Sequence, residues 1–308
     1  MASVNTANVT ATLYSSSGSA MDVPKSATLA PKGQVLFGFN AVTSSSGYVR
    51  VRSDRPIAGL ELYGPADKLS ALGAVSPGSE ARLFFPHFAA NQGFTTLIGM
   101  VNSNSTVTNL VLTAYGDDGL PQGTRAYVTL QPNAQLLQSV NDLFDIGQGS
   151  LVTGYVIAES DQSGIQGFAS YHFDDGTHQS AAAVPFDSVL RQRLLFSHVV
   201  HQVPAGGGGT YQTGVALLNP FGVPVEYTIR VYDSPGNVVA ERKDILGPRQ
   251  KVAKILSHPV AGAGFFTQSL PLSSGHIEVL TDYGLMGLEV FFTEDLSQLV
   301  IVRAQSAN

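Results

Sequence analysis

The chain has 308 residues and a formal net charge of −6, from 17 Lys and Arg against 23 Asp and Glu. Charged residues make up only 13% of it, roughly half the share that is usual in soluble domains. No basic stripe is visible, which excludes a nucleic-acid interface. The absence of Cys excludes disulfides, thiolate catalysis and cysteine metal sites. No apolar run reaches the roughly 18 residues of a membrane span, and no leader is visible.

Alternation of apolar and polar residues begins at the N-terminus and continues along the chain. Val9, Ala11 and Leu13 alternate with polar neighbours, and so do Val49 and Val51. A period of two predicts strands with one buried face and one face in water. Clusters of turn residues separate such runs at 15–18, 116–119 and 233–237. Short strands with these turns predict antiparallel β-sandwiches.

Four landmarks recur three times in the same order. An Asn ends an apolar strand, a Tyr precedes a Gly-bearing turn, a Leu-x-Pro turn follows, and a segment opening with Gly closes the set. The landmarks are Asn5, Asn102 and Asn219; Tyr14, Tyr115 and Tyr232; Pro31, Pro132 and Pro248; and Gly47, Gly154 and Gly275. A period of about 100–120 residues has the length of a whole domain. The sequence therefore predicts three copies of one β-domain.

Two similar openings fix the boundaries between the copies. Arg82–Phe88 reads RLFFPHF, and Arg193–Val199 reads RLLFSHV. We therefore expect an incomplete β-sandwich repeat over residues 1–80, a second repeat over 81–190 and a third over 191–308. Each is long enough to bury its own core, and the short linkers predict close contact between neighbours.

Helical patterning is nearly missing from the sequence. The best candidate for a helical turn is the segment Leu136–Phe144, which reads LLQSVNDLF. Residues 251–257 lie at the equivalent point of the third repeat and share that expectation.

The first repeat is expected to lack its opening strands. Residues 82–101 precede Asn102, whereas only residues 1–4 precede Asn5. At the other end of the chain an apolar segment occupies the place where a further copy would open: Leu299, Val300, Ile301 and Val302. An extended segment can fill an incomplete sandwich of a neighbour through main-chain hydrogen bonds, and such contacts build rings or filaments. Alternatively, the first repeat uses a smaller strand set or has lost its beginning.

One cluster comes nearest to an ion site, namely His172, Asp174, Asp175 and His178 in YHFDDGTH. A divalent ion needs more oxygen ligands at fixed spacing, and Asp-Asp-Gly is typical of a hairpin turn. We interpret the cluster as turn chemistry, and leave open whether it binds an ion.

Three carboxylates hold matching positions in the repeats: Asp54, Asp161 and Asp282. A turn cap has a reason to appear in triplicate, and a catalytic pair has none. Neither a Gly-x-Ser-x-Gly elbow nor a phosphate loop occurs. We therefore predict no catalytic residue, no cofactor site and no metal site.

The repeat motifs together resemble tandem immunoglobulin-like β-sandwich repeats of bacterial secreted and cell-surface proteins. They are Phe85–Ala89, Val101–Ser103, Leu130–Pro132, Gly154–Ala158 with Asp161, and Ile165–Phe168. The resemblance covers essentially the whole chain. It implies an all-β protein of three tandem antiparallel sandwiches with an extracellular or cell-surface location. Because its motifs are structural, it carries over no active residues.

The expected function is a non-enzymatic structural or adhesive role, with self-association or another surface protein as the partner. The alternative is a carbohydrate- or surface-binding module. Its candidates are Tyr211 and Phe221, aromatic residues beside loops that are particular to the third repeat. A hydrolase is a third class, and it requires a concave pocket with converging Ser, His and Asp.

Overall fold

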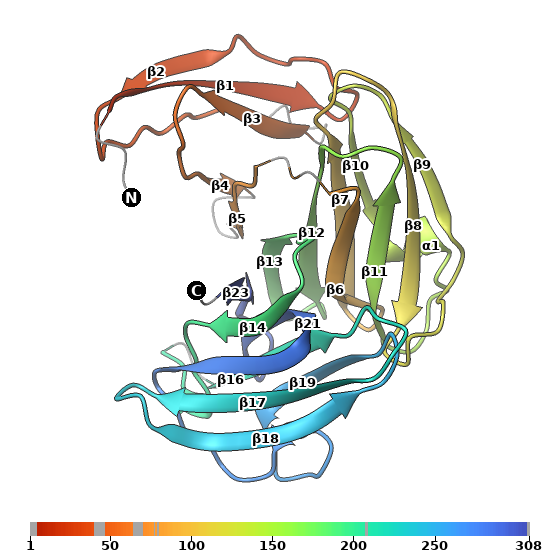
Figure 1. Cartoon of the computed structure of the whole chain (residues 1–308), viewed down its shortest axis with the longest axis vertical. Coiled ribbons are helices and arrows are strands. Elements are labelled where there is room, and N and C mark those ends of the chain that lie inside the picture. Colours follow the sequence, from red (N-terminus) through yellow and green to blue (C-terminus); the bar gives the residue numbers. More distant parts are fainter. Residues whose placement is uncertain are drawn as a thin grey trace.

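The computed structural model describes residues 5–39, 47–63, 70–76, 78, 80–206 and 209–306. It is an all-β structure of antiparallel sheets, and α1 (Val140–Phe144) is the one α-helix among the described residues. Three β-units follow one another in a C-shaped row, with both chain ends toward the open side of the C (Figure 1). We call them the first unit (residues 7–73), the second unit (82–185) and the third unit (191–306). Within the described part of the chain, no helix has the length and apolar character to traverse a bilayer.

The second unit is a complete sandwich of two four-stranded sheets. One sheet has the order β6 (Arg82–Ala90), β11 (Val152–Ser160), β8 (Thr108–Gly116), β9 (Ala126–Leu130). The other has the order β10 (Gln135–Ser139), β7 (Phe94–Asn102), β12 (Ile165–Asp174), β13 (Gln179–Pro185). All neighbours are antiparallel. The alternation in the sequence places Phe85, Phe88, Ile98 and Leu112 in the core between the sheets.

The third unit repeats this plan with one long strand shared by both sheets. Its strands are β14 (Arg191–Phe196), β15 (Val203–Pro204), β16 (Thr210–Leu218), β17 (Val225–Asp233), β18 (Val238–Leu246), β19 (Lys251–Ser257), β20 (Gly264–Phe266), β21 (Gly275–Thr293), β22 (Leu299–Arg303) and β23 (Gln305–Ser306). The first part of β21 pairs with β14 and β17, and the second part pairs with β16 and β22. Leu194, Phe196, Leu217 and Ile229 lie in its own core.

The Asn landmarks have the same contacts in the second and third units. Asn102 and Asn219 are fully buried, and each side-chain amide donates to three main-chain oxygens. The acceptors are Thr106, Leu130 and Gln131 for Asn102, and Val223, Leu246 and Gly247 for Asn219. Since a buried amide must find partners, each Asn ties its strand to the Leu-x-Pro turn of the opposite sheet.

The Leu-x-Pro landmarks form the same turn in all three units. The residue after each Pro has a left-handed conformation, with φ of 62° at Lys32, 60° at Asn133 and 58° at Arg249. A Pro followed by a residue of positive φ is typical of a type II turn. Each turn is closed by a main-chain hydrogen bond of 2.8–3.1 Å from the residue after the left-handed one.

The helix prediction is only partly correct. Residues 135–139 form β10, and the helix begins at Val140 with Ser139 as its N-cap. Residues 251–257 form β19, so the expected helical turn there is wrong. Pairing with β7 and β16 decides the outcome, because a ladder partner overrides a weak local helical pattern.

The first unit contains only part of the same strand set. β2 (Lys25–Leu29), β1 (Ala7–Ser15) and β3 (Gly47–Ser53) form one sheet in that order, and β4 (Leu60–Tyr63) pairs with β5 (Ser70–Gly73). The register equates β1, β2 and β3 with β8, β9 and β11, because Tyr14 faces Tyr48 as Tyr115 faces Tyr155. β4 and β5 hold the places of β12 and β13. The described residues contain no counterpart of β6 or β7.

The expectation that every repeat buries its own core is wrong for the first unit. Among its described apolar side chains only Ala7, Val9 and Ala11 are buried. The second and third units each have a large core, as expected. Among the described residues the first unit has one sheet of three strands and one of two, against four and four in the second unit, and these are too few to cover the apolar faces.

Strand ladders among the described residues stay within the three units, but apolar packing continues between the second and third. Phe84, Tyr155 and Ile157 of the second unit pack against Leu218 and Met286 of the third. The core of the second unit also reaches the outer face of the third, at Ala216, Leu288 and Ile301. The short linker therefore joins units that are in close contact.

Candidate functional site

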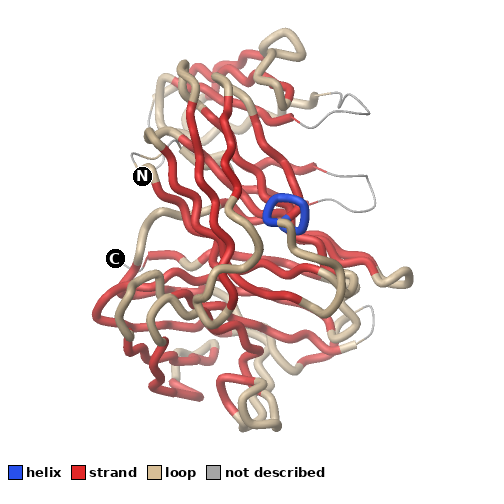
Figure 2. The backbone as a smooth tube through the Cα atoms, turned by 90° about the vertical axis from the view of Figure 1, so that its right-hand side faces the viewer, coloured by secondary structure: helices blue, strands red, loops and turns tan. Residues whose placement is uncertain are grey.

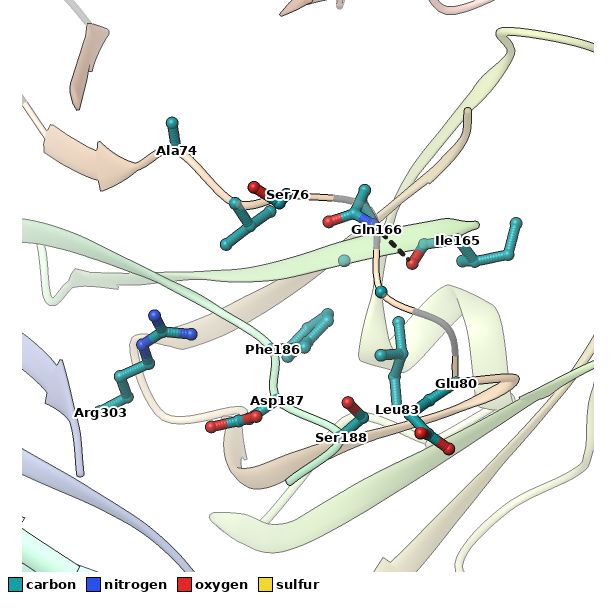
Figure 3. Close-up of a pocket in the computed structure, with 13 residues that line it drawn as sticks. Ala74, Ser76, Glu80, Leu83, Ile165, Gln166, Phe186, Asp187, Ser188 and Arg303 are labelled. Atoms are coloured by element: carbon teal, nitrogen blue, oxygen red, sulfur yellow. Dashed lines mark hydrogen bonds between the residues drawn. The ribbon is translucent and has the colours of Figure 1, made fainter. Parts of the chain in front are cut away.

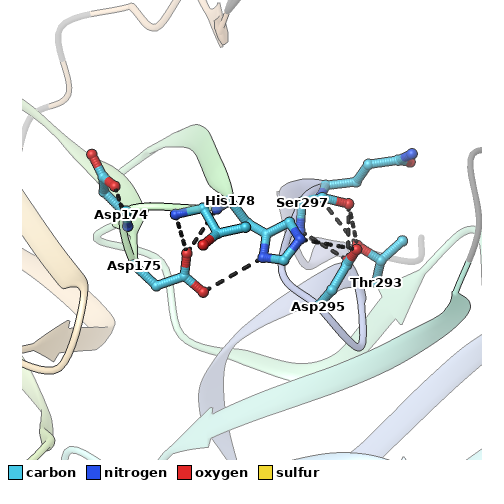
Figure 4. Close-up of polar contacts among 9 residues, drawn as sticks. Asp174, Asp175, His178, Thr293, Asp295 and Ser297 are labelled. Carbon is cyan, nitrogen blue, oxygen red and sulfur yellow. Dashed lines mark hydrogen bonds and ion pairs between the residues drawn. The ribbon is translucent and has the colours of Figure 1, made fainter.

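The cluster around the hairpin between β12 and β13 is built from turn contacts (Figure 4). The Asp175 carboxylate accepts hydrogen bonds from the main-chain N–H groups of Thr177 and His178, at 2.8 and 2.7 Å. These bonds hold the pKa of Asp175 below its usual value. Asp174 caps the same turn through Gly176 N–H, while His172 bonds to Ser170 at 2.9 Å. The structure thus supports the turn interpretation.

His178 also joins the second unit to the third. Its ring lies 3.5 Å from Asp175 and 3.9 Å from Asp295 (Figure 4). Hydrogen bonds from Thr293 and Ser297 lower the pKa of Asp295 to about 2, so this carboxylate stays charged. No group of three or more metal-ligating side chains occurs within the described residues.

Two of the three recurring Asp residues, Asp54 and Asp161, are strand clamps. Asp54 accepts from the main chain and the side chain of Asn8, both at 2.8 Å. Asp161 accepts from Asn109 in the same two ways, at 3.1 and 2.8 Å. A carboxylate with two bonds to one neighbouring strand holds that strand in register, so these two residues are strand clamps rather than the expected turn caps. Asp282 is exposed, and Glu226 stands at the position of Asn8 and Asn109, so this clamp does not recur in the third unit.

The two aromatic candidates for glycan binding are not brought together. Tyr211 lies at the start of β16, and Phe221 follows its other end. The rest of β16 after Tyr211 lies between them and spans roughly 23 Å. The Tyr211 hydroxyl donates to Gln298, and the Phe221 ring packs edge-on against Tyr283. They do not form one sugar platform.

The C-terminal apolar segment is a strand of its own unit. Leu299, Val300, Ile301 and Val302 belong to β22, which is antiparallel to β21 from Leu288↔Arg303 to Phe292↔Leu299. It holds the place that β13 has beside β12. The expectation that this segment stands where a further copy would open is therefore wrong, because the third unit uses it as its own strand. Donation to a neighbour remains a prediction, and it first requires β22 to leave β21.

A hollow of about 340 Å³ lies where the three units meet (Figure 3). One wall is the linker around Ala74 and Ser76, another is Ile165 and Phe186 of the second unit, and Arg303 of the third unit lies at the rim. Glu80, Asp187, Ser76 and Ser188 also line it, but its described lining contains no His, which a hydrolase site of this kind requires. We assign it no chemistry.

The open side of the first unit is the most unusual surface of the molecule. The outer edge of β3 corresponds to the edge of β11 that pairs with β6, and one edge of β4 corresponds to the edge of β12 that pairs with β7. Leu60 is 66% exposed and Leu62 is 61% exposed. Unpaired strand edges beside apolar side chains are a template for another strand.

A further segment borders the same open place. Residues 34–38 (QVLFG) correspond to β10, which pairs with β7 in the second unit, yet they form no strand. Leu36 is 92% exposed and Val35 is also exposed. The segment has strand composition without a ladder partner, so the missing β7 explains its lack of strand structure. The sequence signal for this site was the shortage of residues before Asn5.

Comparison with known proteins gives little. No protein-family model and no curated protein matches the chain. Among solved structures, one is described as "Crystal Structure of Thermotoga maritima 1070"; it is 16% identical and covers 35% of this chain and 92% of that one, with a TM-score of 0.31. The others are a glycosyl hydrolase family 2 member from Bacteroides cellulosilyticus DSM 14838 (7% identity, TM-score 0.16) and a family 2 beta-glucuronidase (9% identity, TM-score 0.18).

These likenesses do not support a functional assignment. The match to the family 2 glycosyl hydrolase covers 70% of this chain but 27% of that protein, and the match to the beta-glucuronidase covers 73% and 23%. The chain thus spans about a quarter of the length of either protein. TM-scores this low carry no argument, so the resemblance to immunoglobulin-like surface repeats remains a prediction.

Proposed function

We propose that the chain is a non-enzymatic structural or adhesive protein of the cell surface or extracellular space, and that its first unit binds extended strands of another polypeptide. The carrying observation is the incomplete first sandwich. Among the described residues each of its sheets has a free edge, and Val51 is 44% exposed although its counterpart Ala158 lies in the core of the second unit. The charged and polar groups that first suggested chemistry support a structural role instead, since they cap turns and clamp strands.

The energetics favour strand binding at this place. The strand that fills the same place in the second unit fully buries Ile98 and Met100, and burial of each such side chain contributes about 1.5–3 kcal/mol. A bound strand would also pair the free main-chain groups of β3 and β4, and it would give residues 34–38 the ladder partner that β10 has in β7. Main-chain pairing supplies affinity, and the apolar side chains supply register.

A self-complemented variant tests this proposal. Residues 1–4 are replaced by a copy of residues 82–101, which places β6 and β7 ahead of Asn5 in the register that they have before Asn102. We expect hydrogen exchange to slow in β3, β4 and residues 34–38. A labelled peptide of sequence 82–101 should bind the original chain saturably and should not bind the variant. The control peptide carries Pro at two ladder positions and should bind neither.

Equal peptide binding to the original chain and to the variant would contradict strand binding. So would unchanged exchange in the variant when circular dichroism shows that it is folded. Antibody labelling of intact producing cells tests the proposed location, and labelling that appears only after lysis would exclude a surface role.

A further inference from the structure

The two joints between units are made in the same way. At the first joint the Tyr48 hydroxyl donates to the main-chain oxygen of Asn133 at 3.0 Å. At the second joint the Tyr155 hydroxyl donates to the main-chain oxygen of Arg249 at 2.7 Å. Tyr48 and Tyr155 hold the same position in their units, and Asn133 and Arg249 are the left-handed residues of their Leu-x-Pro turns. One contact therefore recurs between successive units.

A main-chain bond accompanies this contact at both joints. Gln135 N–H donates to Ser16 at 2.8 Å, and Lys251 N–H donates to Asp117 at 3.0 Å. Each acceptor lies in the turn after its Tyr landmark. The glycine two residues later approaches the neighbouring unit so closely that a Cβ would lie 2.5–2.6 Å from a main-chain oxygen. The glycines at these turns, with φ of 88° and 81°, permit the approach.

Each joint therefore has two halves. The stacked aromatic pair together with its Gly-bearing turn is called the donor half. In the second unit this pair is Tyr115 and Tyr155, with ring centroids 5.0 Å apart. The Leu-x-Pro turn together with the residues that follow it is called the acceptor half. The second unit contributes its acceptor half to the first joint and its donor half to the second. Such a contact is heterologous, because different surfaces meet.

The third unit carries a donor half without a partner among the described residues. Tyr232 and His276 stack with centroids 4.4 Å apart, as the two tyrosines do in the other units. The turn is closed by Gly236 N–H to Asp233 at 3.0 Å, and the equivalent bond in the second unit, Gly119 N–H to Gly116, is also 3.0 Å. Gly119 is buried in its joint, whereas Gly236 is exposed.

The first unit carries the matching acceptor half. Lys32 has the left-handed conformation of Asn133 and Arg249. Lys32 and Gln34 are exposed, while Gln135 and Lys251, the counterparts of Gln34, are buried in their joints. The exposed side chains of Leu60 and Leu62 add to this surface, since their counterparts Leu288 and Val290 in the third unit pack against the core of the second.

Both free halves face the open side of the C (Figure 1). The turn between β17 and β18 and the end of β2 lie on the same side of the molecule, at the two tips of the row. Figure 2 shows the first and third units at opposite ends of the molecule in the perpendicular view as well. A single sandwich in the opening would meet both tips, with its acceptor half on the third unit and its donor half on the first.

We propose that the open side of the C receives one further β-sandwich of the same class, contributed by another polypeptide, which completes both free joints and closes a ring of four sandwiches. Repeated heterologous contacts generate a ring when the rotation closes. A whole second copy fits less well. Its first unit would take the opening, and its second unit would then be carried into the space of the first unit of the original molecule (Figure 1).

The chemistry of the third unit's donor half indicates what its partner presents. Ile157 packs against Leu218 and Met286 at the second joint, but Glu278 occupies the equivalent position in the third unit. Glu278 is nearly buried and is paired with Arg193 at 2.5 Å and Arg230 at 3.9 Å. A buried carboxylate with its own cations favours a polar surface opposite it rather than an apolar one.

The second unit is the better template for such a partner. Arg50 of the first unit holds the same repeat position as Ile157 and Glu278. The acceptor half of the second unit therefore already contacts a donor half that carries a charged residue at this position. Gln166 in this face stands where the third unit has Met286. We therefore expect the fourth sandwich to resemble the second unit in its acceptor face.

An extended chain tests ring closure. A second copy of residues 82–185 is appended behind Gln305 through a copy of the linker 186–190. Gln34→Cys in the first unit and Asp117→Cys in the appended copy place one thiol on each side of the joint that should form. The natural chain has no Cys, so a short bis-maleimide reacts only at these two residues. We expect an intramolecular cross-link, seen as a monomer of altered gel mobility, in most of the molecules.

Two controls keep the result interpretable. Ser16→Cys with Gln135→Cys in the extended chain should cross-link within the molecule whenever the first joint is folded. Gln34→Cys with Ser234→Cys in the original chain should not cross-link, because the opening separates them. Ring closure needs no strand exchange, so residues 1–4 of the extended chain stay as they are and the result is independent of peptide binding.

Either of two other outcomes would overturn the proposal. A ladder of intermolecular products from Gln34→Cys with Ser234→Cys would show that whole copies join end to end. A folded extended chain that cross-links at the first joint but not between the first unit and the appended copy would show that the ring does not close.

Discussion

The first and second units have the same landmarks but different degrees of order. β3 and β11 begin with the same Gly-Tyr-Val, yet one edge of β11 pairs with β6 and the corresponding edge of β3 has no ladder partner among the described residues. Residues 34–38 and 135–139 both begin with Gln and continue with apolar residues, but only the second set forms a strand. The difference shows that strand formation in this protein depends on the neighbouring strand more than on the local sequence.

The largest expected difference between units is in how their stability depends on pH, and it comes from one buried carboxyl group in the third unit. Glu289 and Glu61 hold the same position in the third and first units, opposite Val302 and Leu72. Glu289 is buried, and burial raises its pKa from 4.5 to about 9. The folded state thus keeps a proton that the unfolded state loses above 4.5, so its contribution is full below that pH and falls as the pH rises toward 9. At pH 7 the loss is about 3 kcal/mol.

Glu289→Gln should remove this pH dependence because the amide does not titrate. We expect the free energy of unfolding of the third unit, from urea denaturation at about pH 5 to 9, to be flatter in the variant and higher than in the original chain at the alkaline end. Glu61→Gln is the matched variant and should flatten the profile less. Desolvation raises the pKa of Glu61 as well, but Glu61 is exposed in the open unit, so we expect its effect on stability to be smaller. Parallel profiles for Glu289→Gln and the original chain would show that Glu289 is hydrated.

A core truncation should distinguish the two units next. Val156 is fully buried in the second unit, and Val49 holds the same position in the first but is half-buried. Val156→Ala should cost about 2 kcal/mol of stability through lost burial and a cavity. Val49→Ala should cost less than about 0.5 kcal/mol, because little is covered at this position. Hydrogen exchange of β11 and β3 measures each effect locally, and equal losses would mean that the first unit is closed in solution.

The smallest expected effect lies at the second joint. The Lys251 ammonium is buried and contacts Asp117 at 2.8 Å, His87 at 2.7 Å and the main-chain oxygen of Gly154 at 3.1 Å. Burial lowers the pKa of Lys251 to about 8, although Asp117 opposes the shift. Asp117→Ala leaves this cation without its counter-ion. Because the Asp117 carboxylate is nearly half exposed, we expect a loss of only about 1 kcal/mol.

Ser16→Ala is the matched change at the first joint. Ser16 contributes only its main-chain oxygen to this joint, as the acceptor of the hydrogen bond from Gln135 N–H. We expect no measurable loss there. Thermal unfolding followed by circular dichroism checks both variants, and a Tm that falls as much for Ser16→Ala as for Asp117→Ala would remove the special role of the buried ion pair.

Much of the fold follows from the sequence, because its cause is local and periodic. Alternation predicts the strands, and the spacing of Asn102 and Asn219 predicts two equivalent clamps that the structure confirms. The described residues of the first unit contain no counterpart of β6 or β7, in agreement with the expectation drawn from the run before Asn5. The place of β22 cannot be predicted from the sequence, because the segment Leu299–Val302 has the same apolar pattern whether it is donated to a neighbour or paired within its own unit.

The joints were harder to predict, although their residues are the landmarks themselves. Tyr155 and the turn at Arg249 recur in the sequence, but recurrence alone does not say that one unit's tyrosine contacts the next unit's turn. The burial of Lys251 also has no sequence signal, because Gln135 holds the same position in the second unit and Gln34 in the first. Packing between units, which depends on their relative placement, decides these contacts.

The shared strand β21 has a mechanical consequence. In the second unit the two sheets are connected by separate strands with a turn between them, and either sheet can fray without pulling directly on the other. In the third unit one run of 19 residues belongs to both sheets. A tensile load on the chain's C-terminal end is therefore shared by ladders in two layers, and the third unit should rupture in one event where the second gives way in stages.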